Sequence, residues 1–138
     1  VIGPGGLMIV GVDLKKDKAI LDAAYDDAAG VTAAFNLNML AHINAELGAD
    51  FDLDRFAHHA AYYPERGRVE MHLVSLADQT AHVAGEAFHF AKGEHIHTEN
   101  SCKYEIAGFQ DLARRAGWTP RAVYTDPDTM FSLHALEA

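Results

Sequence analysis

The spacing of apolar residues changes along the chain, and each spacing predicts a different element. The first stretch, Leu7 to Val12, is continuously apolar, which is typical of a strand buried on both faces, as in a parallel sheet. Asp13 follows it, at the strand end where ligand sites gather in open α/β sheets. Asp17 is then placed to cap a helix that runs to Tyr25.

A longer helix is predicted after Gly30. Thr32 is its expected N-cap, and apolar side chains at four-residue spacing from Phe35 to Leu47 form a stripe along it. Gly48 is placed to end this helix, because glycine readily takes the left-handed conformation found at helix ends.

From about Phe56 the apolar spacing becomes two, which predicts an antiparallel meander of short strands whose last member is His95 to Ser101. Helical spacing returns over Glu105 to Ala116. Two strands, Arg121 to Thr125 and Met130 to Leu136, complete the chain. This order predicts an α/β sheet that is interrupted by an inserted α+β module.

Composition narrows the class of protein. The chain has 138 residues, 49% of them hydrophobic, which suits one globular domain. A net charge of -9 argues against nucleic acid or an anionic membrane as the main partner. With one cysteine, no bilayer-spanning apolar run and no signal peptide, we expect a cytoplasmic protein. Because the chain opens on Val1 and enters a strand almost at once, we expect it to be part of a longer polypeptide.

The segment from Glu94 to Tyr104, E-H-I-H-T-E-N-S-C-K-Y, has too few aliphatic residues for an ordinary core strand. In an extended chain Glu99 and Ser101 lie on the same face. A carboxylate and a hydroxyl placed together can hold a ligand that offers a cation or an N–H group, such as an imidazole. The alternative, which the spacing alone favours, is a half-exposed strand end with solvated polar residues.

The same segment offers a second pattern, H-x-H-x-E, formed by His95, His97 and Glu99. Two imidazoles and a carboxylate on one strand face can bind zinc or another divalent metal. A third and fourth ligand at a defined offset would sharpen this signature, and the sequence supplies neither. We therefore assign no metal ligand from the sequence.

Other candidate residues have ordinary structural interpretations. Tyr25, at a helix end, can donate its hydroxyl to a carboxylate or can be a core aromatic with a polar tip. Asn36 and Asn38 are more often solvated or locally hydrogen-bonded than ligand-binding, and Cys102 has no defined base beside it. The chain contains neither G-x-G-x-x-G nor a P-loop, so spacing alone does not name a reaction.

Three strings give a specific resemblance when they are taken together. They are V-G-V-D-L-K-K-D (Val10 to Asp17), A-Y-D-D-A-A-G-V-T-A-A-F-N-L-N (Ala24 to Asn38) and H-T-E-N-S-C-K-Y (His97 to Tyr104), with R-V-E-M-H-L (Arg68 to Leu73) between them. The chain closely resembles the C-terminal part of the histidine-specific Nα-methyltransferases of the ergothioneine pathway. The resemblance runs from Gly6 to the C-terminus.

The resemblance implies an activity and a fold. The family uses S-adenosylmethionine to methylate the α-amino group of L-histidine three times, which gives hercynine. The resemblance implies that residues 1–13 and 104–138 are the C-terminal part of a Rossmann-like class I methyltransferase sheet. It also implies that residues 14–103 are an α+β histidine-binding module that interrupts this sheet. The glycine-rich cofactor motif of the family is absent. We therefore expect S-adenosylmethionine to be bound mainly by an N-terminal half, and this chain to be inactive alone.

The resemblance also implies site residues. Glu99 and Ser101 match positions that hold the substrate imidazole, Met71 matches a position lining the imidazole pocket, and Tyr25 matches a tyrosine that contacts the substrate carboxylate. No residue is assigned to catalysis or to cofactor binding. The expected partners are L-histidine and its methylated forms, with either a complementary N-terminal half or a second copy of the chain. The alternatives are a non-catalytic amino-acid-binding module and a small metal-binding α+β protein.

Overall fold

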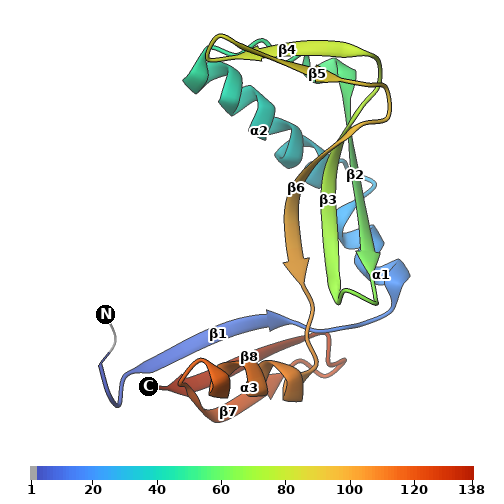
Figure 1. Cartoon of the computed structure of the whole chain (residues 1–138). Helices are drawn as coiled ribbons and strands as arrows, with labels where there is room; N and C mark the ends of the chain where they lie inside the picture. Colours follow the sequence, from blue (N-terminus) through green and yellow to red (C-terminus); the bar gives the residue numbers. More distant parts are fainter. Residues whose placement is uncertain (1–2) are drawn as a thin grey trace. The chain divides into compact units, whose positions relative to one another are not determined.

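The structure is a computed structural model that describes residues 3–138 and forms two compact units (Figure 1). The first unit combines the segment that ends at Asp17 with Cys102–Ala138, and the second unit is Lys18–Ser101. Val1 and Ile2, which belong to the expected methyltransferase segment 1–13, lie outside the described residues. The fold is mixed α/β, as expected, but the strands form separate small sheets, one in the first unit and two in the second.

The first unit is a three-stranded sheet with one helix. The strands lie in the order β1 (Leu7–Asp13), β8 (Phe131–Glu137) and β7 (Thr119–Thr125), and β8 is antiparallel to both neighbours. The helix α3 (Ile106–Arg115) lies between β6 and β7 in the chain. These bounds confirm the predicted helix and the two predicted strands at the C-terminus.

The expectation that β1 is a parallel strand buried on both faces is wrong. β1 pairs antiparallel with β8, and Leu7 and Ile9 are each 66% exposed. The opposite face of the sheet is covered, since His134 of β8 is fully buried and its ring packs against Phe109 of α3. An apolar run shows that a strand is hydrophobic, but it fixes neither the direction of the neighbouring strand nor the number of covered faces.

The second unit has two helices and two further sheets. Its elements are α1 (Lys18–Tyr25), α2 (Val31–Leu47), a single 3₁₀ turn η1 (Leu53–Arg55), β2 (Phe56–Tyr63), β3 (Arg68–Ser75), β4 (Gln79–Val83), β5 (Glu86–Phe90) and β6 (His95–Cys102, whose last residue belongs to the first unit). One sheet has the order β2-β3-β6, and β4 and β5 form a separate hairpin (Figure 1).

The predicted continuous meander is therefore wrong, although its strands are present. After the β4–β5 hairpin the chain returns to the end of β3, where Ser75 N–H donates to the Glu94 carbonyl at 2.8 Å and Gly93 N–H donates to the Ser75 carbonyl at 2.7 Å. These bonds set β6 beside β3 instead of beside β5. The sequence shows the hairpin turns, but these return contacts are non-local and leave no periodic signal.

Both helices pack on one face of the β2-β3-β6 sheet. Leu21 of α1 joins a core cluster that contains Val69 and Met71 of β3, and Leu40 of α2 joins a second cluster that contains Leu73. The three β3 residues are two apart in sequence, so they point to the same side of the sheet. We call this side the helix face.

The start of α2 differs from the expectation. The N-cap is Gly30, with a φ of 71°, and not Thr32. The carboxylate of Asp27 accepts hydrogen bonds from the backbone N–H groups of Val31 at 3.0 Å and Thr32 at 2.8 Å, and these bonds hold the pKa of Asp27 at about 2. Asp27 thus satisfies the first-turn donors that a cap residue usually serves. At the other end Gly48 is left-handed, as predicted.

Among the helices described, none combines the length and the apolar character needed to cross a membrane.

Candidate functional site

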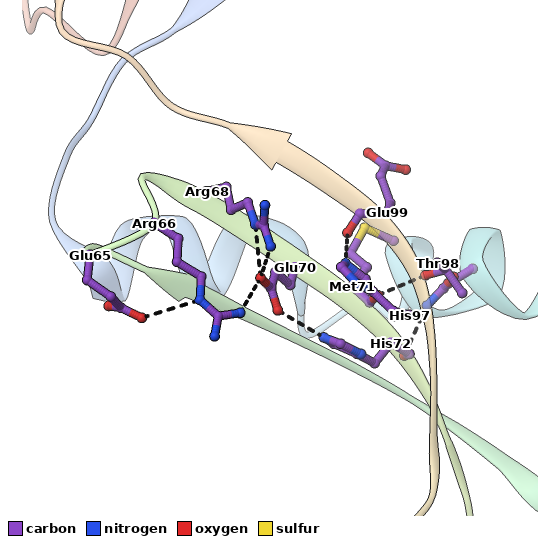
Figure 2. Close-up of polar contacts among 10 residues, drawn as sticks. Glu65, Arg66, Arg68, Glu70, Met71, His72, His97, Thr98 and Glu99 are labelled. Carbon is purple, nitrogen blue, oxygen red and sulfur yellow. Dashed lines mark hydrogen bonds and ion pairs between the residues drawn. The ribbon is translucent and has the colours of Figure 1, made fainter.

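Two of the predicted site residues contact each other directly. Tyr25 ends α1 and Ser101 lies near the end of β6, and the Tyr25 hydroxyl is 2.7 Å from Ser101 Oγ across 76 residues of sequence. Tyr25 also packs against the core cluster that contains Met71. Met71 is 2% exposed, and its backbone carbonyl accepts from Thr98 Oγ1 at 3.0 Å (Figure 2). Tyr25, Met71 and Ser101 therefore belong to one contiguous region.

Glu99 lies beside a pocket in the same unit. The pocket has a volume of about 250 Å³. Its walls come from α2 and β6 and are formed by Phe35, Asn36, Asn38, Met39, Thr98 and Glu99. Glu99 is exposed and Ser101 is half-buried. A carboxylate at the wall of a small pocket is placed to accept an N–H group of a ligand.

A buried polar network supports Tyr25 from the helix face. Asn36 is 3% exposed, and its Nδ2 donates to the His72 carbonyl at 3.1 Å and lies 3.0 Å from His58 Nδ1. Since this amide nitrogen only donates, His58 Nδ1 accepts and His58 Nε2 carries the proton. His58 Nε2 then donates to the Tyr25 carbonyl at 2.8 Å. The network fixes both the imidazole and the end of α1.

The sequence pattern did not predict this network, since Asn36 and His58 lie on separate elements and His58 was given no role. Alternation along β2 sends His58 and His59 to opposite faces. Only the strand register, in which His58 pairs with Leu73, shows that His58 is the one on the helix face.

Asp13 is not an open ligand site, in contrast to the expectation from its position after the first strand. Its carboxylate lies 2.6 Å from Lys103 Nζ and also contacts Lys16. Burial raises the pKa of Asp13, but the hydrogen bonds and charges of Lys103 and Lys16 outweigh it and hold the pKa below its usual value. The carboxylate is therefore engaged within the first unit.

Comparison with known proteins shows the family. The whole chain, residues 1–138, matches a family described as "Histidine-specific methyltransferase, SAM-dependent". The chain belongs to this family of histidine-specific methyltransferases. The match confirms the resemblance carried by the sequence strings.

Three similar proteins are N-methyltransferases by name. The chain is 45% identical over 132 residues to a histidine N-alpha-methyltransferase of Mycolicibacterium smegmatis, with 94% of this chain and 41% of the relative covered. It is 46% identical over 131 residues to the enzyme of the same name from Mycobacterium tuberculosis, with 88% and 40% covered. An N-methyltransferase of Aspergillus terreus, benX, is 31% identical over 116 residues, with 83% and 32% covered. The chain thus spans about two fifths of the length of the first two relatives.

The family depends on S-adenosylmethionine. Nucleotide-like cofactors are often held by a glycine-rich loop between a strand and a helix. Within residues 3–138, the strand-to-helix connections are 14–17, between β1 and α1, and 103–105, between β6 and α3, and neither contains a glycine. These residues do not form such a cofactor loop by themselves, and we assign no cofactor contact to them.

Proposed function

We propose that this chain is the substrate-recognising part of an S-adenosylmethionine-dependent L-histidine Nα-methyltransferase, which makes hercynine for ergothioneine. The family match and the two mycobacterial relatives support the reaction class. The structural observation that carries the proposal is the Tyr25–Ser101 hydrogen bond, which joins two of the strings on which the resemblance rests. In this proposal Lys18–Ser101 binds histidine.

The proposed roles follow from the chemistry of the side chains. The Glu99 carboxylate accepts one imidazole N–H, and the Ser101 hydroxyl serves the other ring nitrogen. Met71 is an apolar wall, and the Tyr25 hydroxyl reaches the substrate carboxylate. Because Nα-methylation needs a neutral amine aimed at the methyl group, the main contribution of these residues is orientation.

The first unit is proposed to be one end of a Rossmann-like class I methyltransferase sheet. Two features support this. β1 and β7 are both antiparallel to the central β8, so they run parallel to each other, as in a mixed α/β sheet with one reversed strand. One edge of β1 and the side chains of Leu7 and Ile9 are left for a further neighbour, either another part of a longer polypeptide or a second copy. We propose that S-adenosylmethionine is bound mainly by another part of a longer polypeptide.

Calorimetry with L-histidine and L-phenylalanine tests the proposal. Phenylalanine keeps the amino and carboxylate groups but lacks ring nitrogens, so histidine is expected to bind more tightly. Equal affinity for both would contradict the proposed contacts of Glu99 and Ser101 with the imidazole ring, which we call the imidazole clamp. A methyl-transfer assay on the chain alone is expected to give no hercynine. Hercynine formed without any partner would overturn the proposal that another part of the polypeptide is needed to bind S-adenosylmethionine.

His58 is expected to act as a positioning residue for Tyr25. His58→Ala removes the donor to the Tyr25 carbonyl and the acceptor for Asn36. Losing two hydrogen bonds of about 0.5–1.5 kcal/mol each is expected to raise the Kd for histidine roughly 5- to 150-fold.

The neighbouring variant His59→Ala, on the opposite face of the same strand, is the matched control and is expected to keep histidine affinity. His58→Gln retains one donor and one acceptor and should recover part of the loss. A His58→Ala protein that binds histidine as the unchanged chain does would exclude the positioning role, whatever its thermal stability.

A further inference from the structure

Imidazole rings gather on the face of the β2-β3-β6 sheet opposite the helices. In the β2–β3 register His59 pairs with His72, and Ala61 pairs with Glu70, one residue out of phase with the helix face. The His72 ring centroid lies 4.6 Å from that of His97 and 5.3 Å from that of His95, both on β6. We call this side the histidine face. None of these imidazoles belongs to the proposed substrate site.

Three side chains on the histidine face bring potential ligand atoms close together. One carboxylate oxygen of Glu70 and one ring nitrogen each of His72 and His97 all lie within 4.8 Å of one another. Figure 2 shows that the three side chains come from the neighbouring strands β3 and β6. The separation is short enough for a single ion to be shared after small rotations of the side chains.

The Glu70 carboxylate is held in place by two arginines. Its Oε1 accepts from Arg66 at 2.8 Å and from Arg68 at 2.7 Å, while Oε2 lies 3.5 Å from His72 Nε2 (Figure 2). These bonds leave Oε2 as the oxygen that points toward His72. Hydrogen bonds to the second oxygen of a carboxylate ligand are a common outer-shell arrangement at metal sites.

His72 carries an atom that the protein leaves unsatisfied. Its side chain is 13% exposed, and its buried Nδ1 has no hydrogen-bond partner among residues 3–138. The nitrogen that lies toward Glu70 is Nε2, at 3.5 Å from Oε2, so neither ring nitrogen of His72 is held by a normal hydrogen bond among the described residues.

We propose that Glu70, His72 and His97 form a binding site for a divalent transition-metal ion, Zn²⁺ or Cu²⁺, on the histidine face. Two imidazoles and one carboxylate suit these borderline metals better than Mg²⁺ or Ca²⁺, which prefer all-oxygen ligands. His95 and His59 are near enough to offer a further ligand, and water can complete the coordination.

The proposed ligand set differs from the H-x-H-x-E pattern and from the sequence assignment of no metal. Of His95, His97 and Glu99, only His97 belongs to the set, and Glu70 and His72 come from the adjacent strand. His97 lies across from β3 on the neighbouring strand, and strands in a sheet lie about 4.8 Å apart. A pattern read along β6 alone does not show the two ligands that β3 supplies.

The test is a titration of the untagged chain with Zn²⁺, followed by calorimetry, and with Cu²⁺, followed by electron paramagnetic resonance. We expect one tight ion per chain and nitrogen hyperfine structure from imidazole ligands. Losing an outer-shell partner typically weakens metal binding about 10- to 100-fold. His72→Ala and His97→Ala each remove a direct ligand, so each should weaken binding by at least this much.

His89→Ala is the matched control, because His89 is an exposed imidazole on β5 that hydrogen-bonds Thr80. It should bind the ion as the unchanged chain does. Glu70→Gln, which keeps the shape but removes the charge, should also weaken binding and covers the case in which a histidine variant fails to fold. Equal affinity in all four variants, or no tight ion in the unchanged chain, would overturn the proposal.

Discussion

Replacing Glu99 with alanine is expected to weaken L-histidine binding by about 1–3 kcal/mol, roughly a 5- to 150-fold increase in Kd. In the proposed complex Glu99 supplies the acceptor for an imidazole N–H, so its removal leaves that donor without a partner. Calorimetry measures the effect. Glu99 is exposed at the pocket wall, so the same substitution should change the midpoint of thermal unfolding little.

Two further variants sharpen this prediction. Glu99→Gln keeps an acceptor but loses the charge. Its Kd for histidine should lie between that of Glu99→Ala and that of the unchanged protein. Glu86→Ala removes an exposed carboxylate on β5 of the same unit and should leave histidine affinity unchanged. A Glu99→Ala protein with unchanged affinity would remove the clamp from the proposed mechanism.

Asp13→Ala is expected to lower the free energy of unfolding by about 3 kcal/mol. The Lys103 side chain is fully buried, and Asp13, which is 27% exposed, lies 2.6 Å from its ammonium group. Removing one member of a buried pair typically costs about 3–5 kcal/mol, because the remaining charge loses its counter-ion. The partial exposure of Asp13 places the expected value at the low end of that range.

Urea unfolding measures this loss, and two comparisons interpret it. Asp111→Ala breaks an exposed pair with Arg114 and should cost less than about 1 kcal/mol. Replacing both members, Asp13→Leu with Lys103→Met, should recover much of the stability, because no charge is then left buried. If Asp13→Ala unfolds like Asp111→Ala, the pair is not a stabilising contact.

The pair also sets a dependence on pH. The pKa of Asp13 in the folded chain lies below its usual value, so its contribution is fully present above that usual value, about 3.9. It is lost as the pH falls through the lowered pKa. The stability difference between the unchanged chain and Asp13→Ala should therefore be constant near neutral pH and shrink in acid.

The sequence predicted where most helices and strands lie, but it did not predict which strands pair. Periodicity located α3 and the strands β7 and β8, because local spacing determines which face of a helix or strand is apolar. It did not show that β6 returns to β3, since that pairing depends on contacts between distant residues such as Ser75 and Glu94. It also misjudged β1, because an apolar run carries no information on strand direction.

The site residues also fall into two groups, those that the sequence predicted and those that only the structure shows. The family strings supplied Tyr25, Met71, Glu99 and Ser101, and the structure brings Tyr25 and Ser101 into contact. Local patterns could not supply the Asn36–His58 network or the Glu70–His72–His97 group, because each joins separate elements of the chain. Such groups become visible only when the strand register is known.

The His58–His59 pair makes β2 sensitive to changes in length. His58 faces α2 and Tyr25, and His59 faces His72 on the other side. If one residue were deleted between His59 and the β2–β3 turn, every side chain before it would move to the opposite face. Ala57 would then take the place beside Asn36, His58 would leave the helix face, and His59 would enter the helix face at the place of Ala60. Homologues that vary in this strand should therefore gain or lose residues in pairs, or carry a bulge that restores the phase.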